Sequence, residues 1–197
     1  MKGINIFLAD GFEDMEALST NDILRRGGVN VNLIAIKDEP FVVSSHGVTL
    51  CVDKFLSDIR EGQKGVDAKD FMIFPGGMPG SSNLAGCGRL LGLMKEHVAA
   101  GGSVAAICAA PGLVLSRLDS ISGLQFTCFD GFEAPVKAKG AEFVKKPSVT
   151  QRLPEGGYFI TGRSAGYAPD FAMAILEAVA SEENAARAKQ GVWIEVK

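Results

Sequence analysis

The chain has 197 residues, of which 47% are hydrophobic and 22% are charged, and its net charge is −3. This composition is typical of a soluble globular protein, and the length is sufficient for one hydrophobic core, so we expect residues 1–197 to form a single domain. A basic pair such as Lys145-Lys146 is too short to form a nucleic-acid-binding patch. The sequence therefore argues against nucleic acid as a partner.

The N-terminal segment MKGINIFLADGFED contains an apolar run of only six residues before Asp10. Such a run is too short for the core of a signal peptide or for a membrane span, so we expect a cytoplasmic protein with no membrane partner. The cysteines follow no CxxC spacing and are expected to be free thiols. They are Cys51, Cys87, Cys108 and Cys128. With only His46 and His97 as histidine ligands, we expect no metal and no other cofactor.

Segments with strand character alternate with segments of helical periodicity. The apolar run 4–9 predicts a strand, and the spacing of Met15, Leu18, Ile23 and Leu24 predicts a helix over 15–26. Further strands are predicted at 29–36, 70–77, 103–107, 124–128, 148–153 and 157–161. A small β excursion with a turn at His46-Gly47 is predicted at 41–53. Further helices are predicted at 89–100, 110–118, 170–180 and 182–190. This alternation predicts an α/β fold of the flavodoxin-like, doubly wound type, in which helices cover both faces of a mostly parallel sheet.

Ligands of such sheets bind at the carboxyl ends of the strands. Cys108 lies between the strand 103–107 and the next helix, where a sharp turn can expose a nucleophile. The small residues Ala109 and Ala110 allow strand and helix to approach closely, and a helix N-terminus favours a thiolate. The alternative interpretation is a buried and inert cysteine.

Two further features are expected at the same edge of the sheet. Glu13 and Asp14 complement the helix dipole, whereas Glu16 lies on the helical face toward the sheet. A carboxyl group near a thiolate is driven to its protonated form and can then donate a hydrogen bond to sulfur. The pair Gly76-Gly77 is either a simple turn or a source of backbone amides for an oxyanion hole.

The stretches LADGFEDMEA, FPGG, AAICAAP and TGRSAGYAPDFAMAILEA resemble the ThiJ/PfpI superfamily, which is related to class I glutamine amidotransferases, over nearly the whole chain. The similarity is greatest to the branch that contains the parkinsonism-associated deglycase and bacterial proteins named for thiazole biosynthesis. The PfpI peptidase branch has a histidine directly after the nucleophile, where this chain has Ala109, so the resemblance argues against a peptidase.

The resemblance also implies roles for individual residues. Cys108 matches the reactive cysteine, Glu16 the glutamate that hydrogen-bonds it, and Gly77 with Ala109 the oxyanion donors. Arg163 matches an arginine at the rim of the pocket. Proteins of this branch are commonly homodimers, and residues 44–51 with the helix 15–26 would then lie at the interface.

The chain departs from the family pattern at two positions. Many members have a histidine about twenty residues after the nucleophile, where this chain has Cys128. His46 stands where the deglycase has an arginine that reaches toward the partner's site. If a histidine base is required, this protein either lacks it or recruits His46 across a dimer. We expect His97 to lie on the surface of a helix.

The leading hypothesis is a cofactor-independent, glyoxalase- or deglycase-like enzyme, a hydro-lyase or hydrolase that acts on methylglyoxal or its adducts. Cys108 would add to the carbonyl, Gly77 and Ala109 would bind the oxyanion, and Glu16 would move protons. The alternative is a thiol-based sensor of oxidative stress, or a chaperone with little turnover, in which Cys108 is oxidised to a sulfinate. A third possibility, thiazole monophosphate synthesis, rests on inherited family names, and no glycine-rich phosphate motif supports it.

Overall fold

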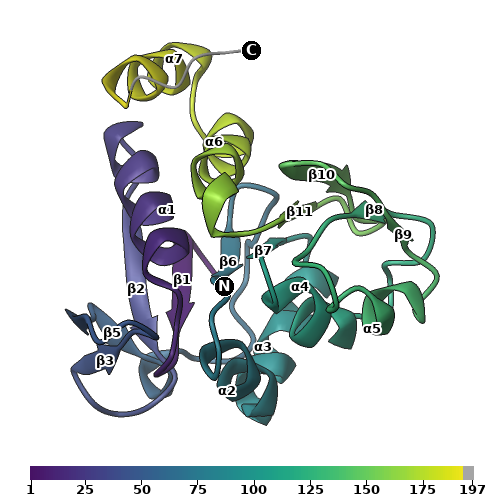
Figure 1. Cartoon of the computed structure of the whole chain (residues 1–197), viewed down its shortest axis with the longest axis horizontal. Coiled ribbons are helices and arrows are strands. Elements are labelled where there is room, and N and C mark those ends of the chain that lie inside the picture. The colour runs from purple at the N-terminus through teal and green to yellow at the C-terminus, as the bar shows by residue number, and fades with distance from the viewer. Residues whose placement is uncertain (193–197) are drawn as a thin grey trace.

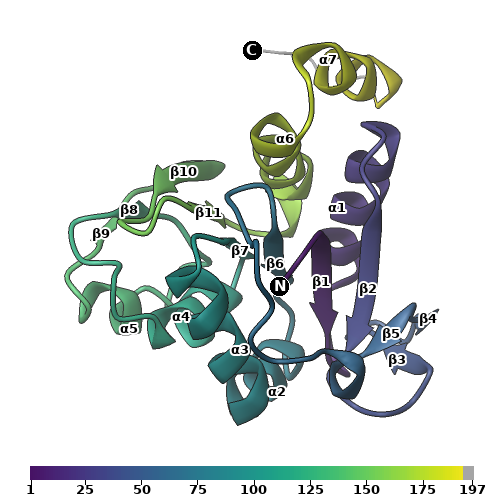
Figure 2. The same cartoon turned by 180° about the vertical axis from the view of Figure 1, so that it is seen from behind.

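Seven strands form the central sheet of the computed structural model, which describes residues 1–192 (Figures 1 and 2). Their order is β10–β11–β7–β6–β1–β2–β5, and all neighbours are parallel except β10 and β11. The strands are β1 (Ile4–Leu8), β2 (Val31–Ala35), β5 (Lys54–Phe55), β6 (Phe71–Phe74), β7 (Ser103–Ile107), β10 (Ser148–Arg152) and β11 (Tyr158–Gly162). This sheet confirms the predicted doubly wound α/β fold.

Helices cover both faces of the sheet. On one face lie α1 (Asp14–Arg26), α6 (Ala168–Val179) and α7 (Glu182–Gly191), and on the other α2 (Gly80–Gly86), α3 (Gly88–Ala99), α4 (Ala110–Leu113) and α5 (Ala134–Lys137). Successive side chains of a strand point to opposite faces. In β1, Ile6 packs with the α1–α6 side and Phe7 with the α2–α4 side. Burial on both faces explains why the central strands are continuous apolar runs.

The remaining elements are short. The hairpin of β3 (Phe41–Val43) and β4 (Thr49–Cys51) confirms the predicted excursion with a turn at His46-Gly47. A separate parallel pair is formed by β8 (Gln125–Phe126) and β9 (Glu142–Phe143), and 3-10 turns cover Leu56–Asp58, Leu115–Arg117 and Ala165–Tyr167.

Two predicted elements differ from the structure, and several short elements, among them α2, α5, β5 and β9, were not predicted. The strand expected at 124–128 is reduced to β8, which lies outside the central sheet, because the amide of Thr127 bonds the side chain of Thr161 rather than a neighbouring strand. The helix expected at 110–118 divides into α4 and a 3-10 turn. The helices α2 and α5 were not predicted, since their four to seven residues are too few to show a helical period.

Two side chains are placed differently from the prediction. Met15 was one of the apolar positions that predicted the first helix, but it is 53% exposed, whereas Glu16 is buried on the face toward the sheet, as expected, together with Ala17, Thr20, Ile23 and Leu24. His97 was expected on a surface and is only 2% exposed. Its position seven residues after the buried Leu90 places it on the inward face of α3, where hydrogen bonds satisfy its ring.

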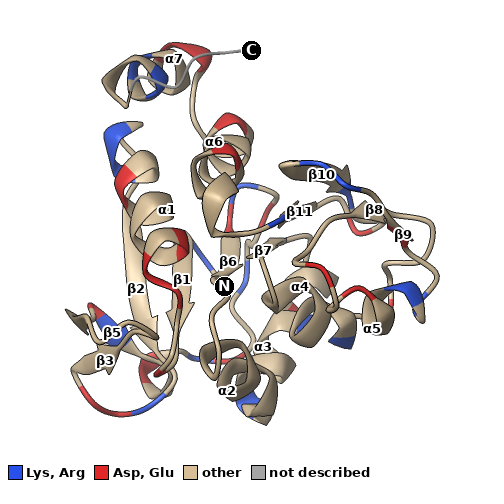
Figure 3. Cartoon of the chain, viewed as in Figure 1, with Lys and Arg blue, Asp and Glu red and all other residues tan. Residues whose placement is uncertain are grey.

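Charged residues are distributed over many separate elements (Figure 3). Several form exposed ion pairs, among them Arg26–Asp22 and Lys37–Asp10, both at 2.7 Å. Exposed pairs of this kind contribute little to stability, so the fold depends on the two apolar layers. Within residues 1–192, no helix combines the length and the apolar character that crossing a membrane requires.

Candidate active site at the carboxyl ends of the strands

Cys108 connects β7 to α4 with a φ of 63°, in the left-handed region. Among residues 1–192 it is the only non-glycine residue with a positive φ, a conformation that is strained for a residue with a side chain. Its amide donates to the carbonyl of Gly162 at 3.0 Å, and its carbonyl accepts from the amide of Phe129 at 2.9 Å. These bonds hold the backbone from both sides and form the sharp strand-to-helix turn that the sequence predicts.

Backbone amides surround the sulfur of Cys108. The amides of Ala109 and Gly77 hydrogen-bond to the Cys108 side chain. Gly77 has a φ of 88°, and a Cβ there would lie 2.4 Å from the amide nitrogen of Glu13. This close approach requires glycine. The structure thus brings together the two backbone donors that the resemblance implies.

Glu16 lies beside Cys108 and is fully buried, with 0% exposure. Glu13 caps α1 by accepting a hydrogen bond from the amide of Glu16 at 2.8 Å. The Oε2 atom of Glu16 accepts from the amide of Gly76 at 2.7 Å, so Gly76, expected with Gly77 as an oxyanion donor, is instead engaged with the carboxyl group. A Cβ at Gly76 would lie 2.5 Å from that Oε2 and 2.6 Å from the Cβ of Cys108. The absence of a side chain at Gly76 therefore allows the carboxyl group to approach the thiol.

The thiol and the carboxyl group perturb each other's ionisation. Burial raises the pKa of Glu16 to about 7, against the opposing effects of the Gly76 amide and the Cys108 thiol. Burial also raises the pKa of Cys108, and the charge of Glu16 and its hydrogen bond with the thiol raise it further, while the Ala109 and Gly77 amides lower it. The acidic thiol expected at a helix N-terminus is therefore not present while Glu16 is ionised. The two groups titrate as a pair that favours a single negative charge.

Cys128 and Arg163 lie on the two segments that flank the elbow. Cys128 is fully buried and precedes Phe129, whose amide bonds the carbonyl of Cys108. Arg163 follows Gly162 in β11, and its Nη2 lies 2.8 Å from Oδ1 of Asp130. The ion pair therefore joins the two segments that hold Cys108. The sequence analysis did not identify Asp130, because no local pattern in CFDGF indicates its partner.

The surroundings of Cys128 disfavour its thiolate. Burial raises the pKa of Cys128 to about 12, and the charges of Glu133 and Asp130 add to this effect, whereas Arg163 opposes it. Nη1 of Arg163 is buried and has no hydrogen-bond partner within residues 1–192.

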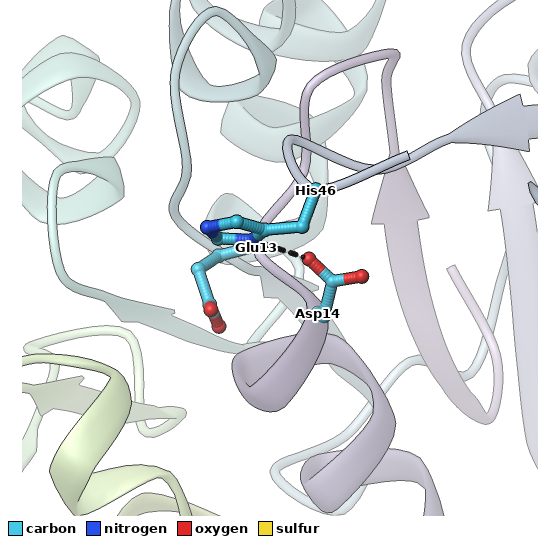
Figure 4. A group of neighbouring side chains, drawn as sticks. All are labelled: Glu13, Asp14 and His46. Carbon is cyan, nitrogen blue, oxygen red and sulfur yellow. Dashed lines mark hydrogen bonds and ion pairs between the residues drawn. The ribbon is translucent and has the colours of Figure 1, made fainter. Parts of the chain in front are cut away.

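His46 lies on the β3–β4 turn, with a side chain that is 71% exposed (Figure 4). Its Nδ1 is 2.8 Å from Oδ2 of Asp14, and its remaining side-chain contact is with Ser45, so in this single chain it is not directed to Cys108. Glu13, Asp14 and His46 place their ligand atoms within 4.8 Å of one another and form the group in the described part of the chain that could hold a metal ion. Both carboxylates already have partners: Glu13 caps α1, and Asp14 also accepts from Ser44.

Comparisons with known proteins agree with this geometry. The sequence profile of the DJ-1/PfpI family matches residues 2–178. Protein dj-1beta of Drosophila melanogaster is 31% identical over 194 residues, which cover 98% of this chain and 97% of the relative. The glutathione-independent glyoxalase DJR-1.2 of Caenorhabditis elegans is 30% identical over 183 residues, 87% of this chain and 84% of the relative. The chain spans only 40% and 44% of two Arabidopsis thaliana relatives, DJ-1 homologs B and A.

Solved structures extend the similarity to the whole fold. The crystal structure of Drosophila melanogaster DJ-1beta superposes with a TM-score of 0.85 at 28% identity and covers 99% of both chains. A mutant of a DJ-1 superfamily protein from Salmonella typhimurium superposes with a TM-score of 0.84 at 27% identity and covers 100% of both chains.

Proposed function

The chain belongs to the DJ-1/PfpI family, and on this premise we propose that it converts small reactive carbonyls, such as methylglyoxal, with Cys108 as the nucleophile. The observation that carries the proposal is the strained elbow that holds Cys108 against the buried carboxyl group of Glu16. One relative that is 30% identical is named a glutathione-independent glyoxalase, which supports a small dicarbonyl as the substrate.

The first step is addition of the sulfur of Cys108 to the aldehyde carbon. The thiol donates its hydrogen bond to the carboxylate of Glu16, so this carboxylate receives the proton as the carbon–sulfur bond forms. The aldehyde oxygen then carries the negative charge, and the amides of Ala109 and Gly77, which already point at the sulfur, can stabilise it. Protonation of this oxygen gives a hemithioacetal.

The second step moves hydrogen within the bound adduct. Removal of the proton from the former aldehyde carbon, protonation of the neighbouring carbon, and transfer of the hydroxyl proton to the ketone oxygen give a thioester of lactate, with no net oxidation. Glu16, with a pKa of about 7, can both accept and return a proton near neutral pH. Water then hydrolyses the thioester, so that methylglyoxal and water yield lactate and the free thiol.

The test is turnover of methylglyoxal by the purified, reduced protein without added cofactor, with lactate as the measured product. We expect Cys108→Ser to lower the rate by at least about 10³-fold. Cys87→Ser is the matched control, because Cys87 is a free thiol at the junction of α2 and α3 and has no part in the proposed reaction. Turnover that survives in Cys108→Ser would refute the mechanism. An inactive wild type whose Cys108 is oxidised cleanly by peroxide would favour the sensor hypothesis instead.

A homodimer forms part of the same proposal. The bridge between Phe12 and Ser44 joins the start of α1 to the β3–β4 hairpin, and together these segments expose Met15, Val43 and Val48. Contiguous exposed apolar side chains are typical of an interface. Sedimentation of the intact protein tests this proposal, and a species of 20.7 kDa at micromolar concentration would contradict it.

A further inference from the structure

Two carboxyl groups at the start of α1 lie next to the histidine of the β3–β4 turn (Figure 4). Glu13, Asp14 and His46 each place a ligand atom within 4.8 Å of the other two. Thirty-two positions separate Asp14 from His46, so the tertiary structure brings the three residues together. One imidazole and two carboxylates form the mixed nitrogen and oxygen ligand set that binds divalent transition metals.

The two carboxylates have no lysine or arginine as a counter-charge. Within residues 1–192, neither forms an ion pair with such a side chain, and Asp14 pairs only with His46, at 2.8 Å. Neighbouring like charges disfavour each other, and a neutral imidazole does not offset them. A divalent cation held by these three groups would balance both carboxylates. The charge of the cluster is therefore complementary to a doubly charged cation.

Hydrogen bonds outside the cluster hold its ligands in place. The hydroxyl group of Ser44 donates to Oδ1 of Asp14 at 2.5 Å. The same hydroxyl oxygen accepts from the amide of His46 at 3.3 Å. The amide of Ser45 donates to the carbonyl of Phe12 at 2.8 Å, which fixes the turn to the segment that leads into α1. Partners of this kind orient metal ligands, so the site is formed before any cation binds.

Each of the three residues keeps an atom that can bind a cation. Glu13 caps α1 through Oε2, and its Oε1 accepts no hydrogen bond within residues 1–192. Nδ1 of His46 and Oδ2 of Asp14 are joined by a hydrogen bond of 2.8 Å. A zinc ion with bonds of about 2.1 Å separates its tetrahedral ligands by about 3.4 Å. Rotation of the exposed His46 ring and of the Glu13 side chain is sufficient to reach this spacing.

We propose that Glu13, Asp14 and His46 form a binding site for a divalent transition cation such as Zn²⁺. The cation takes the place of the proton between Nδ1 of His46 and Oδ2 of Asp14, and this proton passes to solvent. Three protein ligands leave the fourth position of a tetrahedral ion to water. The imidazole favours zinc over magnesium and calcium, which prefer oxygen ligands. The inference uses no atom of Cys108 and does not depend on the proposed reaction.

The experiment is equilibrium dialysis of the intact, reduced protein against zinc chloride, after a chelator has removed bound metal. We expect the wild type to bind one zinc ion in this site. His46→Ala and Asp14→Asn each remove a ligand and should weaken binding by more than about 100-fold. Ser44→Ala removes only the group that orients Asp14 and should weaken binding by about 10- to 100-fold.

Cysteine thiolates compete for zinc, so cobalt(II) is the second probe. Cobalt in the proposed site should lack the intense sulfur-to-metal charge-transfer band that a thiolate ligand produces. Cys51→Ser is the matched control, because Cys51 is an exposed thiol at the end of the same hairpin. Asp22→Asn is the second control, since Asp22 is an exposed carboxylate of α1 that pairs with Arg26. Both controls should bind zinc like the wild type.

Thermal unfolding with and without zinc provides a readout that does not involve turnover. Zinc should raise the unfolding temperature of the wild type and of Cys51→Ser but not that of His46→Ala. Circular dichroism verifies that each variant is folded, and the exposed position of His46 makes His46→Ala the safest variant in this respect. Zinc binding that persists in His46→Ala and Asp14→Asn, or that is lost in Cys51→Ser, would overturn the inference. A wild type that binds no zinc would overturn it as well.

Discussion

The strands β6 and β7 carry a buried titratable group at each of their ends. At the carboxyl ends lies Glu16, between Gly76 and Cys108. At the amino ends lies His97, whose Nε2 is 3.1 Å from the carbonyl of Asp70 and 3.0 Å from that of Ser103. In both places a glycine makes room, since a Cβ at Gly102 would lie 2.3 Å from the ring of His97.

The two groups differ in how completely they are satisfied. Both nitrogens of His97 have partners, because Nδ1 lies 2.7 Å from the N-terminal amine of Met1. Glu16 has one oxygen that accepts no N–H or O–H hydrogen bond within residues 1–192, and its polar neighbour is a strained cysteine. A buried group with all its partners specifies structure. A buried group with an open position beside a strained nucleophile is instead available for chemistry.

The largest effects are expected from glycine-to-alanine variants at the two ends of β6 and β7. These variants should separate the catalytic role of the Glu16 end from the structural role of the His97 end. Gly76→Ala pushes the Glu16 carboxyl group and the Cys108 thiol apart, and we expect a loss of at least about 10²-fold in methylglyoxal turnover per folded molecule. Gly102→Ala crowds the ring of His97 and should destabilise the fold by about 1–3 kcal/mol, with turnover retained by the folded fraction. Urea unfolding and turnover on the same samples provide both measurements. Equal loss of turnover in both variants would contradict the assignment of a catalytic role to the Glu16 end and a structural role to the His97 end.

Glu16 should make the protein less stable at alkaline pH. Its pKa is raised from 4.5 to about 7 by burial, so the folded state holds the proton more tightly, and this advantage is lost as the pH rises through 7. From pH 5 to pH 8 the unfolding free energy of the wild type should fall by about 2 kcal/mol more than that of Glu16→Gln, as measured by urea unfolding at the two pH values.

The same Glu16→Gln variant removes the charge that raises the pKa of Cys108. At pH 8 its Cys108 should therefore react with iodoacetamide about tenfold faster than that of the wild type. An unchanged alkylation rate would show that Glu16 does not control the thiol.

His97 should produce the opposite pH dependence. Burial, reinforced by the N-terminal charge, lowers the pKa of His97 from 6.5 to about 4. The neutral form is favoured in the folded state, so its contribution is complete above pH 6.5 and is lost as the pH falls toward 4. Between pH 7.5 and pH 5 the wild type should lose about 2 kcal/mol relative to His97→Gln, as measured by urea unfolding. Parallel stability curves for the two proteins would contradict this account.

His46→Ala should have the smallest effect on the fold. The contact of His46 with Asp14 is exposed, and such pairs contribute at most about 1 kcal/mol. We therefore expect thermal unfolding to be nearly unchanged. If methylglyoxal turnover falls while sedimentation shows an intact dimer, His46 acts in the partner's site. If turnover also stays the same, the alternative in which the protein lacks a histidine base is the correct one.

Local patterns were sufficient for the sheet and for the position of the nucleophile. The run from Ile4 to Leu8 is apolar at nearly every position because both of its faces are buried. A continuous apolar run of this kind can be recognised in the sequence alone. Cys108 follows a strand and precedes a helix, so its place at a sharp turn could be predicted from its neighbours. The short elements were not predictable in the same way, because β8 has two residues and its surroundings come from β9 and β11.

The sequence by itself therefore determined the α/β fold, the elbow and the residue types around it, since these depend on periodicity and on neighbours within a few positions. Only the tertiary structure decided how those groups ionise. The amide that binds Glu16 comes from a residue sixty positions away, and the amine that binds His97 from one ninety-six positions away. Desolvation and partners from distant segments set the pKa of each group, and neither can be read from the residues beside it.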